Sequence, residues 1–177
     1  MTKSAKRCNH RGEAVAVGNY LIYAGGTQYM QPSDLAGYDL LLPLTGVPEL
    51  QFGETYTFVG GQGKQPSKIT ALPKGEKVTI LAGQLPDFGG LPSNWEQFLT
   101  GKVIPNLAEG KKILAFCIGS HGRTGSLIAS LIALLEPQVQ DPIAEARRRH
   151  CHHAVETTAQ ARGIFALKGL DLPSHYS

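Results

Sequence analysis

Residues 113–125 have the sequence ILAFCIGSHGRTG, in which an apolar run, a glycine-rich loop and the start of a second apolar run follow one another. Residues 113–116 are all apolar, which is typical of a central strand covered on both faces. Residues 124–135 are apolar around nearly the whole helical circumference, which predicts a buried helix. The stretch therefore predicts a buried strand, a short loop and a buried helix in direct succession.

The loop of this stretch separates Cys117 from Arg123 by five residues. A tightly wrapped loop of that length turns successive backbone amides into one concavity, and the helix that follows adds the positive end of its dipole. The forked guanidinium of Arg123 binds two oxygens of an oxyanion. These features predict a phosphate site formed by Ile118, Gly119, Ser120, His121, Gly122 and Arg123. Gly119, Gly122 and Gly125 are expected to relieve the backbone where the loop curves tightly.

The same surroundings suit Cys117 to act as a nucleophile. A thiol that faces a helix N-terminus and a guanidinium loses its proton readily, and a thiolate below a phosphate is placed to attack phosphorus. The chemistry predicted is displacement through a covalent phosphocysteine. On the residues alone, a buried structural cysteine beside an ordinary glycine turn stays open as the alternative.

Strand and helix patterns alternate along the rest of the chain. We expect strands at residues 14–17, 20–23, 38–42, 78–82 and 113–116, a turn at Gly25-Gly26 and a loop at 60–68. Helices are expected to begin at the capping patterns of residues 93–96, 141–142 and 157–160, with Pro105 kinking or ending the first. This order predicts an α/β domain whose central, largely parallel twisted sheet is flanked by helices on both faces.

Length and charge set the domain limits. The 177 residues suffice for one domain with its own core, and 18% charged residues exclude a disordered chain. Residues 1–13 hold four basic residues and one acidic residue, so the whole net charge of +3 lies there. We predict a basic flexible tail at 1–13, a catalytic domain at 14–168 and a loose C-terminus at 169–177. No clear nucleic-acid surface is predicted; contact of the tail with nucleic acid or another anionic surface stays open as the alternative to a solvated end.

The three cysteines and the lack of an apolar leader after the basic start favour a cytoplasmic protein with free thiols. The longest apolar run, at 127–135, is too short to span a membrane. Residues 8–10 (CNH) and 150–153 (HCHH) are rich in zinc-ligand types, but neither has a standard paired spacing, so no metal or other cofactor is predicted. Cys8 or Cys151 is a candidate disulfide partner for an oxidised Cys117.

The segment CIGSHGRTG at 117–125 resembles the phosphate-binding signature of the cysteine-dependent protein tyrosine and dual-specificity phosphatases. Upstream, LPDFGGLPS at 85–93 resembles the acid loop of that family, and its Asp87 lies 30 residues before Cys117. The resemblance implies that Asp87 is the general acid, because a phosphoester leaving group must take up a proton. It also implies that Thr124 helps to release the cysteine in the second step.

The segment AVETTAQ at 154–160 resembles the part of that family that holds a glutamine near the hydrolytic water. The resemblance implies this role for Gln160, which equally fits the third position of a helix capping box. The chain departs from the family at Phe116, where a histidine is usual, and at Leu85, where a tryptophan is usual. The basic run at 147–149 also resembles the family, and we expect most of it to face solvent, with one arginine near the substrate.

The resemblance implies a phosphomonoester hydrolase that acts on phosphorylated proteins without a cofactor. A phosphate-binding pseudophosphatase stays open, as does a phosphatase of RNA 5′-phosphates or phosphoinositides. The absence of lysine at Ile118, Ser120 and His121 disfavours inositol lipids. Asp87 and the 154–160 segment argue against rhodanese-like sulfurtransferases and arsenate reductases, and the late position of Cys117 argues against the low-molecular-weight phosphatases. The sequence predicts no oligomeric state.

Overall fold

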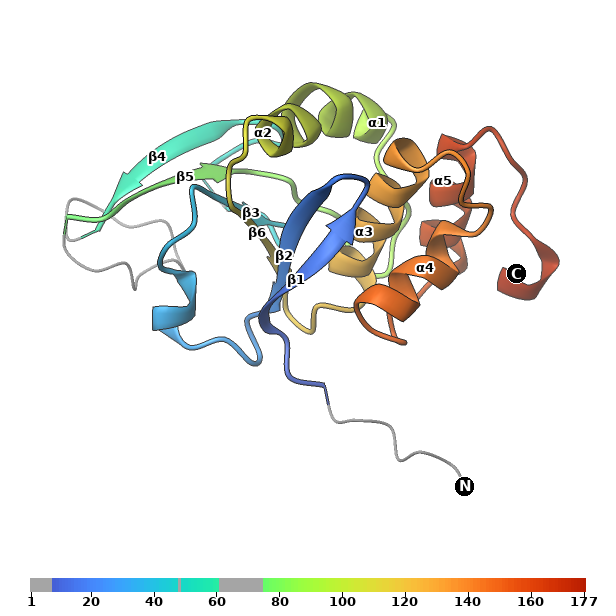
Figure 1. The fold of residues 1–177 in the computed structure, drawn as a ribbon, viewed down its shortest axis with the longest axis horizontal. Helices are drawn as coiled ribbons and strands as arrows, with labels where there is room; N and C mark the ends of the chain where they lie inside the picture. Colours follow the sequence, from blue (N-terminus) through green and yellow to red (C-terminus); the bar gives the residue numbers. More distant parts are fainter. Residues whose placement is uncertain (1–7, 48, 61–74) are drawn as a thin grey trace.

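The fold is built on one six-stranded sheet. The computed structural model describes residues 8–47, 49–60 and 75–177. The strand order is β1-β2-β6-β3-β5-β4; the four inner strands are parallel to one another, and β1 and β4 join antiparallel at the edges (Figure 1). The strands are β1 Arg11–Val17, β2 Tyr20–Gly26, β3 Leu40–Pro43, β4 Thr55–Val59, β5 Lys77–Leu81 and β6 Ile113–Cys117. The predicted single-domain α/β fold with a largely parallel sheet is confirmed.

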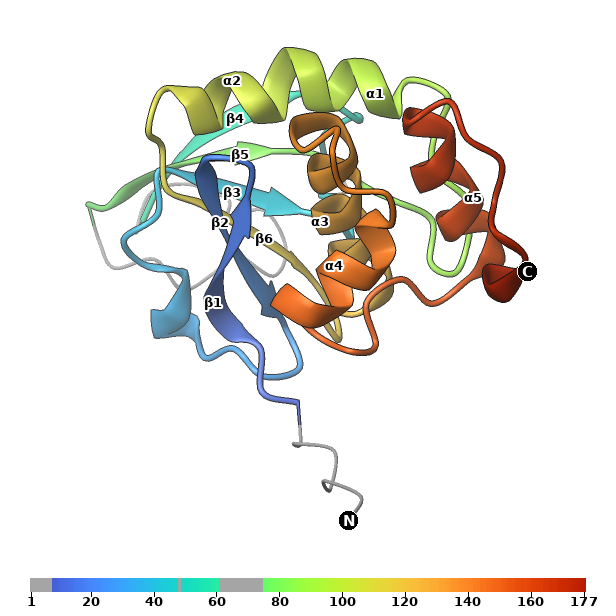
Figure 2. The ribbon, with the colours of Figure 1, turned by 45° about the vertical axis from the view of Figure 1, so that its right-hand side comes forward.

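The two faces of the sheet are covered unequally. The larger core cluster holds buried residues from every α-helix, whereas the opposite face packs mainly against a 3-10 helix, Pro32–Leu35, and the residues that follow β3. Figure 2 shows the helices gathered around one side of the sheet. They are α1 Trp95–Phe98, a π-helical turn Leu99–Val103, α2 Ile104–Ala108, α3 Gly122–Leu135, α4 Pro142–Arg149 and α5 Thr158–Leu167.

Strand β6 lies in the middle of the sheet and carries the chain into the predicted loop. All five of its residues are buried, as its apolar sequence predicted. Because side chains alternate along a strand, Ile113, Ala115 and Cys117 face the helices while Leu114 and Phe116 face the other cluster. The alternation therefore places Cys117 on the helix-covered face, at the carboxyl end of β6 and beside the start of α3.

The structure differs from the local sequence predictions at two places in the sheet. Gly25-Gly26 is not a turn: both residues extend β2 and pair with Phe116 and Cys117. A Cβ on Gly26 would lie 2.6 Å from Ile118 O, so a glycine is needed where β2 meets the loop. Strand β4 was missed because its first three residues, TYT, are exposed on an edge strand and show no apolar alternation.

The first helix differs from its prediction at both ends. It begins after Asn94, and no side-chain cap forms, so the capping box predicted at residues 93–96 is absent. Pro105 does not end the helical segment, which was one of its two predicted effects: it lies in the first turn of α2, directly after the π-helical turn. The predicted caps of the other two helices are confirmed: Asp141 caps α4, and Thr157 with Gln160 forms a capping box on α5.

Both ends of the chain are tied to the domain where they are described. Strand β1 begins at Arg11, within the stretch expected to be tail, and His10 is buried. Beyond residue 169, expected to be loose, the chain forms a 3-10 helix, Ser174–Tyr176. The Tyr176 hydroxyl donates to both carboxylate oxygens of Asp141, at 2.9 and 2.7 Å. The loop predicted at 60–68 lies outside the described residues except for Gly60.

Trp95 links the helix layers, and its loss should be costly. It is 1% exposed, stacks on Phe98 and donates through Nε1 to Ser130 Oγ at 3.0 Å. We expect Trp95→Ala to lower the free energy of unfolding by about 3–5 kcal/mol and Trp95→Phe by clearly less, because phenylalanine fills most of the space. Urea denaturation followed by circular dichroism checks this, since Trp95 is the chain's one tryptophan. Equal losses in the two variants would contradict it.

Candidate active site

Cys117 is a buried thiol at the junction of β6 and α3. The side-chain hydroxyl of Thr124, in the first turn of α3, donates to Cys117 Sγ at 3.0 Å. Helix α3 begins at Gly122 after a four-residue loop, so the sulfur lies beside the positive end of a 14-residue helix. A hydroxyl donor and a helix N-terminus both favour negative charge on the sulfur. Phe116, where a histidine was noted as usual, is buried in the opposite core cluster.

The loop turns its carbonyl groups outward. Four of them accept hydrogen bonds from the surroundings: Cys117 O from Thr27 N (2.9 Å), Ile118 O from Gln28 N (3.1 Å), Ser120 O from His150 Nε2 (2.8 Å) and His121 O from Gly125 N (2.8 Å). Within the part of the chain that the structure describes, the amides of residues 118–123 donate to no protein acceptor. These amides are therefore free to bind an anion, as an anion-binding nest requires.

A buried histidine, which sequence reasoning missed, holds this loop. The His150 side chain has 0% exposure, and its Nε2 lies 2.8 Å from Ser120 O and 3.2 Å from Ser120 Oγ. Ser120 is itself fully buried and has a φ of +61°, a conformation that a non-glycine residue adopts only when its neighbours impose it. The Ser120 side chain thus faces His150.

The structure brings the predicted acid to the predicted arginine. Arg123 Nη2 lies 3.8 Å from Asp87 Oδ1, although the two residues are 36 positions apart. The Arg123 side chain is 11% exposed and that of Asp87 is 60% exposed. The arginine is therefore largely buried in the protein, while the carboxylate lies at the solvent boundary.

Gln160 fills the capping role that the sequence predicted as one of two, and its role near a hydrolytic water stays a prediction. Its Oε1 accepts from Glu156 N at 2.9 Å and from Thr157 N at 3.2 Å, which completes the capping box of α5. Its Nε2 borders the phosphate loop, since a Cβ on Gly122 would lie 3.2 Å from it. The same side chain thus caps a helix and lies at the edge of the loop.

Gly122 and Gly125 are needed for close packing and not for a left-handed backbone conformation. A Cβ on Gly122 would lie 2.5 Å from Glu156 Oε1, and one on Gly125 would lie 2.7 Å from Ala154 Cα. Neither has a positive φ, whereas Val155, which packs there, has a φ of +64°. The prediction that these glycines relieve the curve of the loop is corrected: they let the 154–156 segment lie directly on the start of α3.

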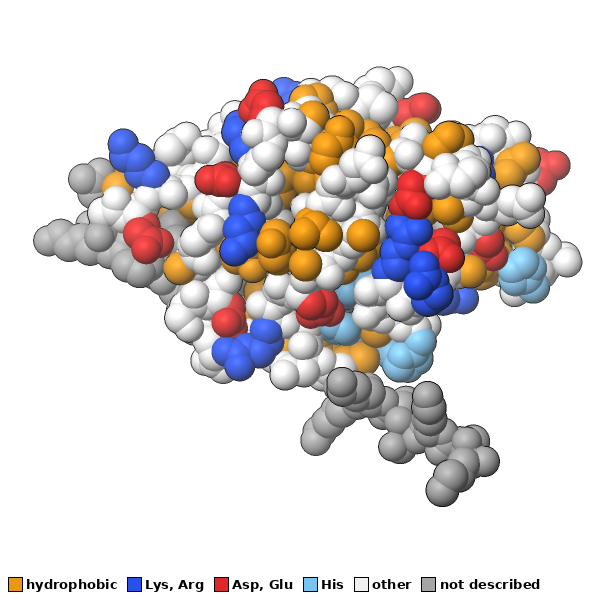
Figure 3. Space-filling view, in the orientation of Figure 1, with side chains coloured by type: hydrophobic (Ala, Val, Ile, Leu, Met, Phe, Trp, Pro, Cys, Tyr) orange, Lys and Arg blue, Asp and Glu red, His pale blue; other side chains and the backbone are white. Residues whose placement is uncertain are grey.

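The basic run of α4 is largely structural, which corrects the expectation of a solvated face. Arg147 donates from Nε to Ala154 O at 2.9 Å and from Nη2 to Val155 O at 3.0 Å, so it holds the segment that lies on α3. Arg149 pairs with Glu136 and is 16% exposed. Arg148 alone is well exposed. Figure 3 shows lysine and arginine side chains lying among acidic ones on the face drawn, not in one basic patch.

His121, a residue of the loop, lies beside a group of other histidines. Burial lowers its pKa to about 4, and the neighbouring His10 and His153 rings act in the same direction, so the imidazole is neutral at neutral pH. It lines a cavity of about 360 Å³ together with Arg147, His152, His153, Val155 and Glu156.

Burial acts to raise the pKa of Glu13, but hydrogen bonds with His10 and His150 outweigh it and lower this pKa to about 2.

Comparisons with known proteins agree on the fold. The crystal structure of Tk-PTP in the active form superposes with a TM-score of 0.63, covering 88% of this chain and 96% of that one at 19% identity. Kinase-associated phosphatase, crystallised with its catalytic-site cysteine replaced by serine, gives 0.63 over 92% and 94% at 12% identity. The protein tyrosine phosphatase of Trypanosoma brucei gives 0.59 over 90% and 74% at 17% identity. The chain therefore has the fold of the tyrosine and dual-specificity phosphatases.

The sequence comparisons find less. No family model matches the chain. Two uncharacterized proteins of Methanocaldococcus jannaschii are 38% identical to it, one over 85 residues and the other over 55. The matches span 56% of the first and 33% of the second. No helix among the described residues has the length and apolar character that crossing a membrane requires.

Proposed function

We propose that this protein is a cysteine-dependent phosphomonoester hydrolase of the tyrosine or dual-specificity type. The observation that supports this most is the gathering of a nucleophile, an anion-binding arginine and an acid around the N-terminus of α3. Cys117 Sγ accepts a hydrogen bond from Thr124, and Arg123 lies 3.8 Å from Asp87. A pseudophosphatase would not need all of these groups in one place.

In the first proposed step, the thiolate of Cys117 attacks phosphorus. A sulfur–phosphorus bond forms while the bond from phosphorus to the leaving oxygen breaks, and the Asp87 carboxyl gives its proton to that oxygen. The guanidinium of Arg123 and the amides of residues 118–123 hold the three equatorial oxygens, over which the transition-state charge spreads.

In the second step, water attacks the phosphocysteine and the sulfur–phosphorus bond breaks. The carboxylate of Asp87 takes the proton of the water, and the Thr124 hydroxyl stabilises the departing thiolate through the hydrogen bond seen at 3.0 Å. Gln160 orients the water from the edge of the loop. No step uses a metal ion or cofactor, because the arginine and the amides bind the charge of the phosphoryl group.

We propose phosphorylated protein, and phosphotyrosine in particular, as the substrate. Two large apolar side chains are exposed on the two loops of the site: Ile118 at 51% and Phe88, next to the acid, at 60%. Apolar groups beside a phosphate site favour an aromatic phosphoester over a sugar or inositol phosphate. Residues 118–122 contain no lysine or arginine, so the loop itself adds none of the charge that a polyanionic headgroup would attract.

The test is hydrolysis of para-nitrophenyl phosphate by purified protein under reducing conditions, beside Cys117→Ser and with or without vanadate. Turnover that vanadate stops and the variant lacks supports the proposal; wild-type turnover no higher than that of the variant rejects it. A panel of phosphotyrosine and phosphoserine peptides, inositol phosphates and 5′-phosphorylated RNA then ranks the substrates. We expect the phosphotyrosine peptide to give the highest kcat/KM.

The role of Asp87 predicts a dependence on the leaving group. We expect Asp87→Asn to lower kcat by about 10²–10⁴-fold on a phosphotyrosine peptide, whose phenolate leaves only when protonated. The loss should shrink on aryl phosphates of more acidic phenols, which need less assistance. Asp171→Asn, at an exposed aspartate, is the matched control and should behave as wild type. A loss that is the same for every leaving group would exclude Asp87 as the acid.

A further inference from the structure

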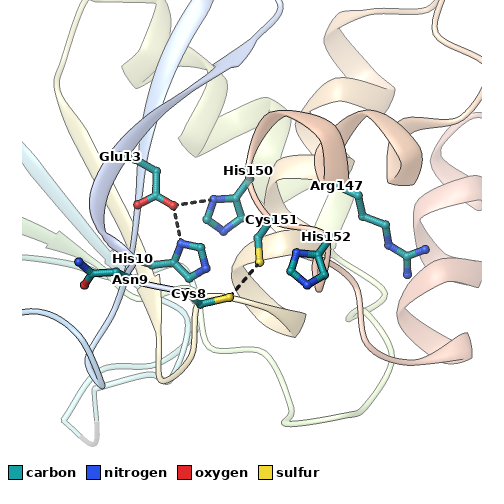
Figure 4. Close-up of a pocket in the computed structure, with 8 residues that line it drawn as sticks. All are labelled: Cys8, Asn9, His10, Glu13, Arg147, His150, Cys151 and His152. Atoms are coloured by element: carbon teal, nitrogen blue, oxygen red, sulfur yellow. Dashed lines mark hydrogen bonds and ion pairs between the residues drawn. The ribbon is translucent and has the colours of Figure 1, made fainter. Parts of the chain in front are cut away.

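Two cysteines that are far apart in the sequence lie side by side next to the phosphate loop. Cys8 Sγ, from the segment before β1, is 3.7 Å from Cys151 Sγ, which follows α4 (Figure 4). They line a cavity of about 580 Å³ together with Asn9, His10, Glu13, Arg147, His150 and His152. The two sulfurs thus face each other, although one of them was expected to serve as a disulfide partner for Cys117.

Two histidine nitrogens complete a four-donor cluster with these sulfurs. One ligand atom from each of Cys8, His10, His121 and Cys151 lies within 4.8 Å of all the others. Tetrahedral zinc, with bonds of about 2.3 Å to sulfur and about 2.0 Å to nitrogen, holds its donors roughly 3.3–3.8 Å apart. The two sulfurs already stand at such a separation, and the other pairs need only small side-chain movements.

The two histidines lack partners at the atoms that would bind a metal. His10 Nε2 and His121 Nε2 are buried and have no hydrogen-bond partner among the described residues. The His10 side chain is 7% exposed, so water does not reach this nitrogen freely, and an unsatisfied buried polar atom is costly. A ligand bound between the histidines and the cysteines would remove that cost.

The surroundings of His10 have the form that metal sites use to orient a histidine. Its Nδ1 is hydrogen-bonded to Glu13 Oε1, so the ring proton lies on Nδ1 and the lone pair of Nε2 points to the cluster. His150 is excluded from the ligand set because its Nε2 is engaged with Ser120 O. A disulfide between Cys8 and Cys151 would explain the sulfur contact alone and would leave both histidine nitrogens unpartnered.

We propose that Cys8, His10, His121 and Cys151 bind one zinc ion in a tetrahedral Cys2His2 site. His121 is the residue directly before α3 begins. By binding it, the ion links the phosphate loop to the segment before β1 and to the connection after α4. Its role is structural: it positions the loop and takes no part in phosphoryl transfer. This site is independent of the proposed function, because its ligands and its fourfold coordination do not depend on catalysis.

The first test measures the metal directly. Untagged Cys117→Ser protein, which lacks the third thiol, is reduced and freed of metal with a chelator. One sample is then given zinc and a second, metal-free sample is given cobalt(II). We expect about one zinc per chain, and with cobalt the visible bands of a tetrahedral site plus a thiolate-to-metal charge-transfer band. Uptake below about a tenth of an equivalent, or a cobalt spectrum without thiolate bands, overturns the proposal.

Variants then assign the ligands. We expect Cys8→Ser with Cys151→Ser to abolish stoichiometric binding, and Glu13→Gln, which keeps all four ligands, to weaken zinc affinity by about 10–100-fold. His175→Asn, at a 63% exposed histidine, is the control and should bind as the parent does. Chelation should lower the Tm of the parent but not that of the double variant. Full zinc binding by the double variant, or an oxidised and metal-free Cys8–Cys151 pair that persists under reductant, contradicts the site.

Discussion

Replacing Cys117 with serine should reduce kcat for aryl phosphates by on the order of 10⁴-fold or more, as the loss of a covalent nucleophile does in other enzymes. The reason lies in the surroundings of the sulfur. The Thr124 hydroxyl donates a hydrogen bond to the sulfur beside the N-terminus of α3, and sulfur at this position is both a better nucleophile and a better leaving group than the oxygen of serine. The single-atom change leaves the loop and its arginine in place.

Three measurements separate a lost nucleophile from a damaged fold. The Tm of Cys117→Ser should stay close to that of the wild type, because the change replaces one buried atom by a smaller one and Thr124 can still hydrogen-bond to it. Phosphate or a phosphotyrosine peptide should still bind, because the amides of residues 118–123 and Arg123 are unchanged. Wild-type protein quenched during turnover should gain the mass of one phosphoryl group, and the variant should not. A variant that retains a tenth of wild-type turnover would show that Cys117 is not the nucleophile.

The centre of this fold could be predicted from the sequence because its signals are local. The strand at 113–116, the loop and the helix at 124–135 follow one another, so two runs of apolar residues with three glycines between and beside them sufficed to find them. The caps at Asp141 and Thr157 were found for the same reason: each depends on residues three positions apart. The acid loop was found by its resemblance, and the structure brings Asp87 to Arg123 across 36 residues.

The parts that were missed depend on contacts between distant segments. Nothing in the local sequence shows that His150 binds Ser120 O, or that Arg147 holds the carbonyls of Ala154 and Val155. Gly26 looked like a turn because the need for a glycine arises from Ile118, a neighbour on another strand. Spacing rules also argued against metal at residues 8–10 and 150–153, since the four donors come from three separate segments that only the fold brings together.

Arg123 should account for the second-largest effect. We expect Arg123→Ala to lower kcat/KM by about 10³–10⁵-fold, as removal of a transition-state arginine does in phosphoryl transfer. Within residues 117–125 it is the one basic side chain apart from His121, whose low pKa leaves it uncharged at neutral pH. With the net charge of +3 confined to residues 1–13, general attraction by the rest of the chain cannot replace it.

The effect of each Arg123 variant on kcat and KM distinguishes the contribution of the positive charge from that of the paired hydrogen bonds of the guanidinium. Arg123→Lys restores the charge but not the fork that binds two oxygens, so it should recover only a small part of the activity. Most of the loss should fall on kcat, because the equatorial oxygens need the guanidinium most when transition-state charge has developed. Arg162→Ala, at an exposed arginine of α5, is the matched control and should keep wild-type kinetics. Full recovery by lysine would mean that the site selects its substrate by charge alone, without a fixed pair of hydrogen bonds.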